Sequence, residues 1–341
     1  MLLSRFAESL YWAGRYLERA EATARMVKVH TELFLDLPSS AGVGWWPLLA
    51  VTGASDEFLG RNTGTDEEAV IAFLSDDPKN RGSILASIAQ ARANLRVSRV
   101  VLPRAAWEVV NDLHGWAVSS SRAAIDRRSR FDWMDAVIAD CQLLTGTLAG
   151  TMNDDEAYAF LQIGRHMERA DMTIRVLDVQ AGILMASGLS TAADQDVPYA
   201  DVTWMSVLRS LSAHEMYRRI AGGGMSGPEA LRFLLQDPRF PRSVEFCLTT
   251  VSRALVRLPR ASAALASGTQ VRAHLGNLVI PDTMLPGDLH DLADDLELGI
   301  GALHDALARS YFRTAAADAL AEPAEDTDRT SLPAQATADA S

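Results

Sequence analysis

A charged pattern that occurs twice in the sequence suits the recognition of carboxylate or phosphate groups. Residues 11–29 and 161–179 share the frame G-R-x-x-E-R-A-(D/E)-x-T-x-R at an offset of 150 residues. Guanidinium groups form bidentate hydrogen bonds with carboxylates and phosphates. The glutamates of the frame would orient these guanidinium groups or accept an ammonium group. The candidate site residues are Arg15, Glu18, Arg19, Arg25, Arg165, Glu168, Arg169 and Arg175.

Three hypotheses fit this motif. In the first, Glu18-Arg19 and Glu168-Arg169 form a buried ion network that fixes the register of the fold, and loss of one partner of such a pair costs about 3–5 kcal/mol. In the second, the arginines of both copies line a cleft that holds a carboxylate or a phosphate. In the third, the glutamates act as acid and base, which we disfavour because adjacent arginines lower a carboxylate pKa away from neutrality. The sequence favours the first hypothesis. The cleft of the second hypothesis stays an alternative.

Both copies of the motif lie on stretches with the periodicity of a long helix. Over residues 4–35 and 154–187 apolar residues recur at spacings of three and four. Gly14 and Gly164 share a helix ridge with the acidic residues of their own copy. A glycine inside a helix costs about 1 kcal/mol relative to alanine. Its presence in both copies predicts a close approach of another backbone or of a ligand.

The remaining periodic segments are also helical, and strand signals are nearly missing. The sequence therefore predicts an all-α fold, a helical bundle. Further helices are expected at about 45–59, 67–76, 81–102, 104–127, 132–150, 201–220, 228–236, 241–258, 260–273 and 287–316.

Other segments recur in the same order in the two halves, which predicts a tandem duplication. Phe73-Leu74 and Asp77-Pro78 are matched by Phe233-Leu234 and Asp237-Pro238. We expect two pseudo-symmetric repeats, about 1–150 and about 151–316, each opened by a helix with the motif. Together they form one domain over 1–316, with the two motif helices close to a pseudo-two-fold axis. Residues 317–341 read as a disordered acidic tail.

Composition excludes several classes of protein. The net charge of −12 disfavours binding to nucleic acid or to anionic lipid. No stretch is apolar enough for a transmembrane helix, and the first residues lack the features of a secretory signal. The two cysteines, Cys141 and Cys247, are far apart inside apolar helical patterns, which suits buried thiols in a reducing compartment. We therefore expect a cytoplasmic protein.

Motifs for a cofactor or a metal are weak in this sequence. The segment 222–227 has the form GxGxxG, but no strand precedes it, and it fits a helix N-cap better. Neither a Walker A motif, nor G-x-S-x-G, nor the Glu-x-x-His ligands of di-iron bundles occurs. The acidic run over 288–295 is typical of the solvated first turn of a helix. We expect no cofactor and no metal, and we lean against an enzyme.

Several segments together resemble one bacterial family, over about residues 1–315. They are Met1-Leu2-Leu3-Ser4-Arg5, Leu10-Tyr11-Trp12, Gly14-Arg15-Tyr16-Leu17-Glu18-Arg19-Ala20-Glu21, Thr23-Ala24-Arg25, Ala91-Arg92-x-Asn94, and Trp107-Glu108 with Asn111. The family is the alpha-E domain, an all-helical domain named for its E-R motif. Glu18 and Arg19 match that motif directly, and Glu168 and Arg169 match it through the repeat.

The resemblance implies a partner rather than a reaction. Such proteins are encoded beside, or fused to, ATP-grasp-type ligases, often with transglutaminase-like peptidases, in systems proposed to make or trim small peptides or amide-linked products. We therefore expect a non-catalytic helical partner, or a substrate-presenting subunit, of an ATP-grasp-type peptide or amide ligase, with a peptide or an amino acid as ligand. Two alternatives stay open: an enzyme acting on an acyl or peptidyl conjugate at the cleft, and a structural oligomerisation module.

Overall fold

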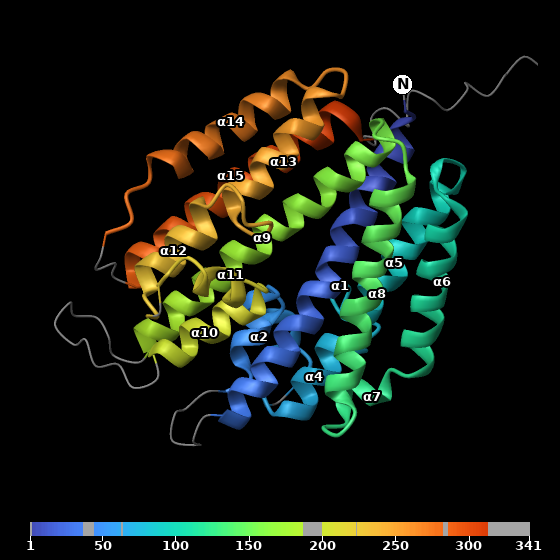
Figure 1. Ribbon diagram of the computed structural model, residues 1–341. Coiled ribbons are helices and arrows are strands. Elements are labelled where there is room, and N and C mark those ends of the chain that lie inside the picture. The colour runs from blue at the N-terminus through green and yellow to red at the C-terminus, as the bar shows by residue number, and fades with distance from the viewer. Residues whose placement is uncertain are drawn as a thin grey trace, which may run out of the picture.

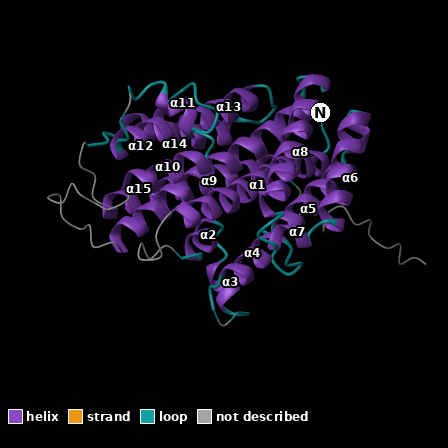
Figure 2. Cartoon of the chain, turned by 60° about the horizontal axis from the view of Figure 1, so that its bottom comes forward, coloured by secondary structure: helices purple, strands orange, loops and turns teal. Residues whose placement is uncertain are grey.

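The computed structural model describes residues 2–36, 44–62, 64–186, 200–222, 224–281 and 286–312. Within these ranges all regular secondary structure is helical (Figures 1 and 2). The predicted all-α fold is confirmed. None of the helices in these ranges is both long enough and apolar enough to cross a membrane.

Two long helices that carry the motifs form the centre of the molecule. They are α1 (Ser4–Asp36) and α9 (Glu156–Ala186), and they pack against each other (Figure 1). Leu10, Leu17 and Val27 of α1 lie on one stripe, and all three are buried. Contact between these two helices brings together segments that lie about half a chain apart.

The helices between α1 and α9 form a layer on one side of this pair. Here α5 (Ile84–Val97) and α8 (Arg130–Thr151) contact α1, and both contact the outer helix α6 (Arg104–Ser119) (Figure 1). The short helices of this half are α2 (Trp46–Val51), α3 (Ser55–Leu59), α4 (Glu67–Ser75), the 3-10 helix Arg99–Val101 and α7 (Arg122–Ile125).

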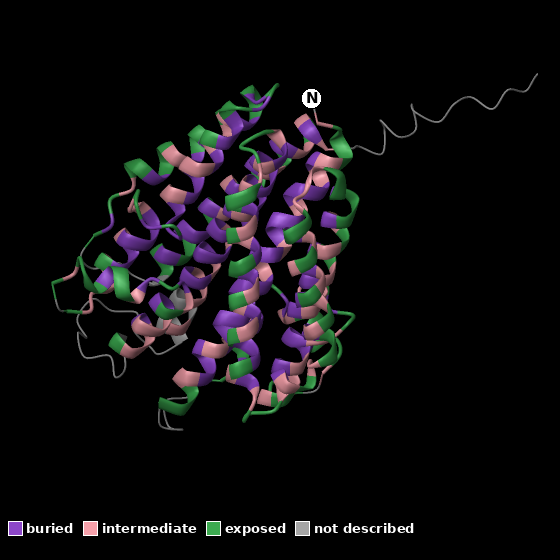
Figure 3. Ribbon diagram, turned by 45° about the vertical axis from the view of Figure 1, so that its right-hand side comes forward, coloured by how far each residue is buried: buried purple, intermediate pink, exposed green. Residues whose placement is uncertain are grey.

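The helices after α9 cover its other side in a comparable way. Here α13 (Val244–Val256) and α15 (Pro286–Tyr311) contact α9, and both contact the outer helix α14 (Ser262–Asn277). The shorter helices of this half are α10 (Ala200–Ser210), α11 (His214–Arg218) and α12 (Gly227–Gln236). The buried residues line the inner faces of these layers, and exposed residues lie on the outer helices (Figure 3).

Four helix starts have matching caps in the two halves. Asp66 and Ser226, and likewise Ser83 and Ser243, lie 160 residues apart, and each accepts a hydrogen bond from the amide three residues later. The prediction that 222–227 ends in a helix N-cap is thereby confirmed. These caps fix where α4, α5, α12 and α13 begin.

Four helices that the sequence predicts as continuous are each broken. The segment 81–102 divides into α5 and the 3-10 helix Arg99–Val101, and 104–127 divides into α6 and α7. The other two breaks occur at residues with positive φ. The segment 45–59 divides into α2 and α3 at Gly53, whose φ is +66°, and 201–220 divides into α10 and α11 at Ser212, whose φ is +52°. A residue with positive φ cannot continue a right-handed helix. Ser212 gave no warning in the sequence, because serine rarely adopts this conformation.

The tail expected over 317–341 lies outside the described residues. The domain over 1–316 and its division into repeats at about residue 150 stay predictions. The residues that the structure does describe include both motif helices in the region of the motif.

Candidate functional site

The two motifs face each other where the backbones of α1 and α9 touch. A Cβ atom added to Gly14 would lie 2.9 Å from the amide nitrogen of Arg165, and one added to Gly164 would overlap the carbonyl oxygen of Tyr11. The predicted close approach at both glycines is confirmed, and the neighbour is a backbone in each case. The side chains beside the glycines therefore reach the opposite helix.

Glu168 of α9 is bonded by two arginines of α1. The Nε atoms of Arg15 and Arg19 each donate to this carboxylate at 2.5 Å, and Nη2 of Arg19 adds a bond of 3.1 Å. Arg15 also donates to Asp171 at 3.4 Å, and Asp171 accepts from Arg175 at 3.2 Å. The Glu168 side chain is only 1% exposed, so these arginines replace its water shell.

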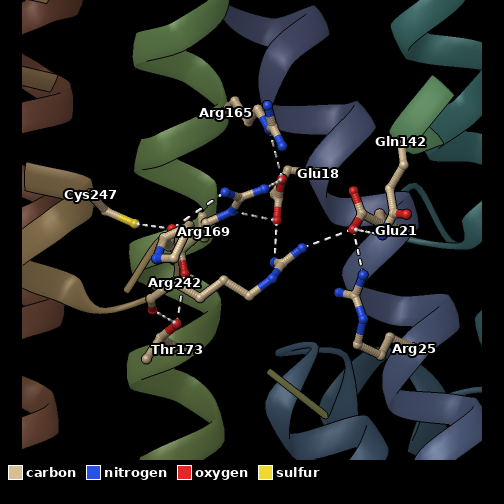
Figure 4. A network of polar contacts seen from close by, with 10 residues as sticks. Glu18, Glu21, Arg25, Gln142, Arg165, Arg169, Thr173, Arg242 and Cys247 are labelled. Carbon is tan, nitrogen blue, oxygen red and sulfur yellow. Dashed lines mark hydrogen bonds and ion pairs between the residues drawn. The ribbon is translucent and has the colours of Figure 1, made fainter. Parts of the chain in front are cut away.

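Glu18 of α1 is bonded in turn by arginines of α9 (Figure 4). Arg165 donates from Nε at 3.2 Å, and Arg169 donates from Nε at 2.9 Å and from Nη2 at 2.7 Å. A third guanidinium, that of Arg242, donates from Nη1 at 2.5 Å. Each motif therefore supplies the arginines for the carboxylate of the other.

Glu21 extends the cluster around Glu18. It accepts from Nη2 of Arg242 at 2.8 Å, from Arg25 one helical turn later, and from Gln142 of α8 at 3.3 Å. We call the first cluster the Glu168 network, made of Arg15, Arg19, Glu168, Asp171 and Arg175. We call the second the Glu18 network, made of Glu18, Glu21, Arg25, Arg165, Arg169 and Arg242. All eight candidate site residues belong to one or the other.

Sequence reasoning missed Arg242. It lies in the loop before α13, directly before the cap Ser243, which matches Ser83 of the first half. The residue before Ser83 is Gly82, so comparison of the two halves pointed away from a charged residue at this place. A buried arginine can come from any loop that reaches the cluster, and periodicity carries no information about loops.

The backbone of that loop is held against α9. Nη1 of Arg169 donates to the carbonyl of Pro241 at 3.3 Å, and the Thr173 hydroxyl donates to the carbonyl of Arg242 at 2.9 Å. The loop therefore cannot shift without breaking bonds to the motif helix. This fixes the Arg242 guanidinium between Glu18 and Glu21.

The arginines of the two networks favour the ionised forms of Glu18 and Glu168. Burial raises the pKa of Glu18, but Arg169 and Arg242 outweigh it and hold the pKa well below its usual value. Burial likewise opposes the charged form of Glu168, and Arg15 and Arg19 lower its pKa. Both carboxylates are therefore ionised at neutral pH.

The buried basic and thiol groups next to Glu18 do not supply a nucleophile. Burial lowers the pKa of Arg242 to about 10, although Glu18 opposes this shift. Burial raises the pKa of Cys247 to about 12 and that of Cys141 well above its usual value. Both thiols are therefore protonated at neutral pH, and a thiol is a weak nucleophile in that form.

The networks are closed except at three side chains. Arg19 and Arg165 are each 28% exposed and Arg175 is 32% exposed, whereas Arg15 and Arg169 are 10% and 5% exposed. The network arginines do not line the cavity beside Tyr217 and Phe233, nor the one beside Phe160 and Tyr311. The cleft expected from the sequence stays a prediction, and of the arginines expected to line it, Arg19 and Arg165 are partly open to solvent.

Comparison with known proteins places the chain among helical domains with this motif. A family model described as "a predicted alpha-helical domain with a conserved ER motif" matches residues 2–312. Two similar proteins are the uncharacterized proteins Mb2597 of Mycobacterium bovis and Rv2567 of Mycobacterium tuberculosis, each 25% identical over 281 residues. The match covers 76% of this chain but only 30% of either relative, so the chain spans less than a third of their length. No solved structure matches the chain significantly.

Proposed function

The chain belongs to the Alpha-E family, and on this premise we propose that it is a non-catalytic helical partner, or a substrate-presenting subunit, of an ATP-grasp-type peptide or amide ligase system. The ligase is the proposed partner, and a peptide or an amino acid is the proposed ligand. We further propose that the protein acts in the cytoplasm and needs no cofactor.

The non-catalytic part of the proposal rests on one observation, the saturation of both motif carboxylates. Every carboxylate oxygen of Glu18 and Glu168 accepts at least one hydrogen bond from a guanidinium group. A general acid or base must exchange a proton near the working pH and must reach its substrate. Buried, ionised and fully bonded carboxylates meet neither condition, and they suit a fixed framework instead.

The length of the relatives supports action beside another protein unit. In the two mycobacterial proteins the matching region makes up 30% of the chain, so this domain is joined there to a larger amount of other sequence. A domain that is covalently joined to other sequence is held at high effective concentration beside it. The family resemblance names an ATP-grasp-type ligase as the kind of neighbour to test first.

The partly exposed side chains of Arg19 and Arg165 support the presentation of a ligand. Arg19 and Arg165 hold their Nε atoms on the motif carboxylates, and their side chains are partly open to solvent. The carboxylate of a peptide or an amino acid would bind to guanidinium nitrogens on this side. The substrate would therefore be positioned by groups that the networks already hold rigid.

We also propose that the chain is a tandem duplication with pseudo-symmetric repeats of about 1–150 and 151–316. Three features support it: the reciprocal bonding of Glu18 and Glu168, the reciprocal contacts of Gly14 and Gly164, and the matching helix caps. A two-fold axis between like elements requires reciprocal contacts of this kind.

Co-purification with an ATP-grasp-type ligase of the same organism tests the proposal. The tagged protein should retain this ligase, and its addition should change ligase turnover. The Glu108→Gln variant, which removes a carboxylate from an exposed pair and keeps the networks intact, should retain the ligase as the unmodified protein does. If the ligase does not co-elute and its turnover is unchanged by the protein, the proposal is wrong.

The same preparation separates the two alternatives. If the protein alone turns over an acyl or peptidyl conjugate, and Glu168→Gln abolishes this activity while the folded fraction is unchanged, the protein is an enzyme. If light scattering shows a stable oligomer and neither a ligase nor a ligand binds, the protein is a structural module.

A further inference from the structure

A cavity of about 550 Å³ lies in the second half of the chain, apart from both networks. Its lining residues come from α11, from the turn that follows α11, and from α12 and the residue that follows it. Its lining mixes carboxylates with apolar and aromatic groups, and includes Tyr217, Ile220, Ala221, Glu229, Phe233 and Asp237. A cavity of this size and mixture is typical of a small-molecule site.

The first half of the chain has the same backbone frame at the corresponding place. There the amide of Arg61 donates to the carbonyl of Phe58 at 3.0 Å, and in the second half the amide of Ile220 donates to the carbonyl of Tyr217 at 2.9 Å. Helices α3 and α11 begin 159 residues apart, and α4 and α12 begin 160 residues apart. Ile220 therefore takes the place that Arg61 has in the first half.

In the first half, Arg61 fills this place with a guanidinium group. Its Nη1 donates to Asp77 at 3.1 Å, its Nη2 forms an ion pair with Glu57, and Nη2 donates to the carbonyl of Lys79 at 3.4 Å. The guanidinium carbon lies 5.9 Å from the ring centroid of Phe73. The chain itself thus shows how a cation is held in this frame: by the carboxylates of Asp77 and Glu57, with an aromatic ring beside it.

The second half keeps the ring and one of the two carboxylates but not the arginine. Met216 lies 159 residues after Glu57 and replaces the other carboxylate. Phe233 and Asp237 lie 160 residues after Phe73 and Asp77. Oδ1 of Asp237 accepts from the amide of Arg239 at 2.7 Å, as Asp77 does from its own loop. Its other oxygen faces the Arg239 side chain at 3.4 Å, and that side chain is 79% exposed. Because the Arg239 side chain is solvated, this pair is weak and does not prevent another cation from binding to Asp237.

We propose that this cavity binds a guanidinium group on an aliphatic stem, such as the arginine side chain of a peptide. The cation would pair with Asp237 and pack on Phe233, in the position that Arg61 occupies in the other half. Glu229 adds a second carboxylate to the lining. The lining also contains Arg232, whose Nη2 donates to the carbonyl of Ile280 at 2.7 Å. The lining therefore has two carboxylates and one guanidinium group, which leaves one negative charge in excess. The proposed site does not depend on the ligase proposal.

Calorimetric titration of the full chain with N-acetyl-arginine amide tests the ligand class. The neutral isostere N-acetyl-citrulline amide is the matched control. The site predicts saturable binding of the arginine compound, at least about tenfold tighter than binding of the citrulline compound, because a charge-assisted pair to a carboxylate exceeds a neutral one. Equal affinities, or no binding of either compound, would overturn the proposal.

The Ile220→Arg variant tests the place of binding. It restores the residue type of the first half, so its own side chain should occupy the cavity and binding of the arginine compound should be lost. Ile220 is 58% exposed, so the substitution leaves the core intact. Val100→Arg adds the same side chain at an exposed position of the first half and should bind as the unmodified protein does. Unchanged binding by Ile220→Arg would overturn the proposal.

A third variant separates charge from shape. Asp237→Asn keeps an oxygen that can accept from the backbone amides of its loop but removes the negative charge. Its circular dichroism and melting curve should match the unmodified protein, while its affinity for the arginine compound should fall at least about tenfold. A folded Asp237→Asn variant with full affinity would show that the cavity does not select a cation.

Discussion

Glu18 and Glu168 lie 150 residues apart in the sequence, and each takes arginine partners from the helix that carries the other. Arg165 and Arg169 of α9 bond Glu18, and Arg15 and Arg19 of α1 bond Glu168. The two helices can meet this pairing in only one register, because a shift by one turn would leave buried charges without partners. The E-R pair of each motif is therefore one half of a contact that the other motif completes.

Removal of one motif carboxylate should strongly destabilise the fold. Glu18→Gln leaves the buried guanidinium groups of Arg169 and Arg242, and the partly exposed one of Arg165, without their carboxylate. We expect the free energy of unfolding to fall by about 3–5 kcal/mol. Denaturant unfolding followed by circular dichroism measures this. Glu108→Gln, which breaks an exposed pair with Arg104, should leave the midpoint almost unchanged. Equal effects of the two substitutions would contradict the buried network.

The stability should also depend on pH in the acidic range. The pKa values of Glu18 and Glu168 are lower in the folded protein than in the unfolded chain, so their stabilising effect is present at neutral pH. It begins to disappear below the unfolded value of about 4.3 and is lost through the lower folded values. Melting temperatures should therefore fall steeply below about pH 4.3, and the fall should be shallower in Glu168→Gln. The same slope in both proteins would contradict the assigned pKa shifts.

Replacement of glycine by alanine should have opposite effects at the contact between α1 and α9 and on the outer helix α6. In Gly164→Ala the new methyl group meets the carbonyl of Tyr11, and we expect a loss of about 1–3 kcal/mol. Gly115 lies inside α6 with open space around it, so Gly115→Ala should gain up to about 1 kcal/mol from helix propensity. Thermal melts of the two variants should shift in opposite directions. A stabilising Gly164→Ala would show that the helices are further apart than described.

The sequence predicted which side chains share a helix face, but not which of them bond. Projection of α1 puts Glu18 near the arginines of its own helix, yet its partners come from α9 and from the loop with Arg242. Helical periodicity describes one helix and contains nothing about the register between two. The backbone contacts at Gly14 and Gly164 fix that register, and the register determines which side chains pair.

Other features depended on single positions without a signal in their residue type. Arg242 was missed because its counterpart is Gly82, and the helix break at Ser212 was missed because serine rarely adopts a positive φ. The helices themselves were predicted well, because the apolar stripes on both motif helices are long and regular.

The thiols should be unreactive until the chain unfolds. Burial raises the pKa of Cys247 to about 12, and Cys141 is also fully buried. A thiol-reactive disulfide reagent should therefore label neither cysteine at neutral pH, and both in denaturant. A Val100→Cys variant supplies an exposed thiol as positive control. Rapid labelling of native Cys247 would show that the interior beside Glu18 is open.

A double-mutant cycle between Glu18 and Arg169 tests most directly whether the two motifs hold each other. Glu18→Gln, Arg169→Gln and the double variant are compared with the unmodified protein by denaturant unfolding. A direct bond across α1 and α9 predicts a coupling free energy above about 1 kcal/mol, and a smaller coupling in the parallel cycle between Glu18 and its sequence neighbour Arg19. Effects of Glu18→Gln and Arg169→Gln that add within about 0.5 kcal/mol would contradict the reciprocal pairing.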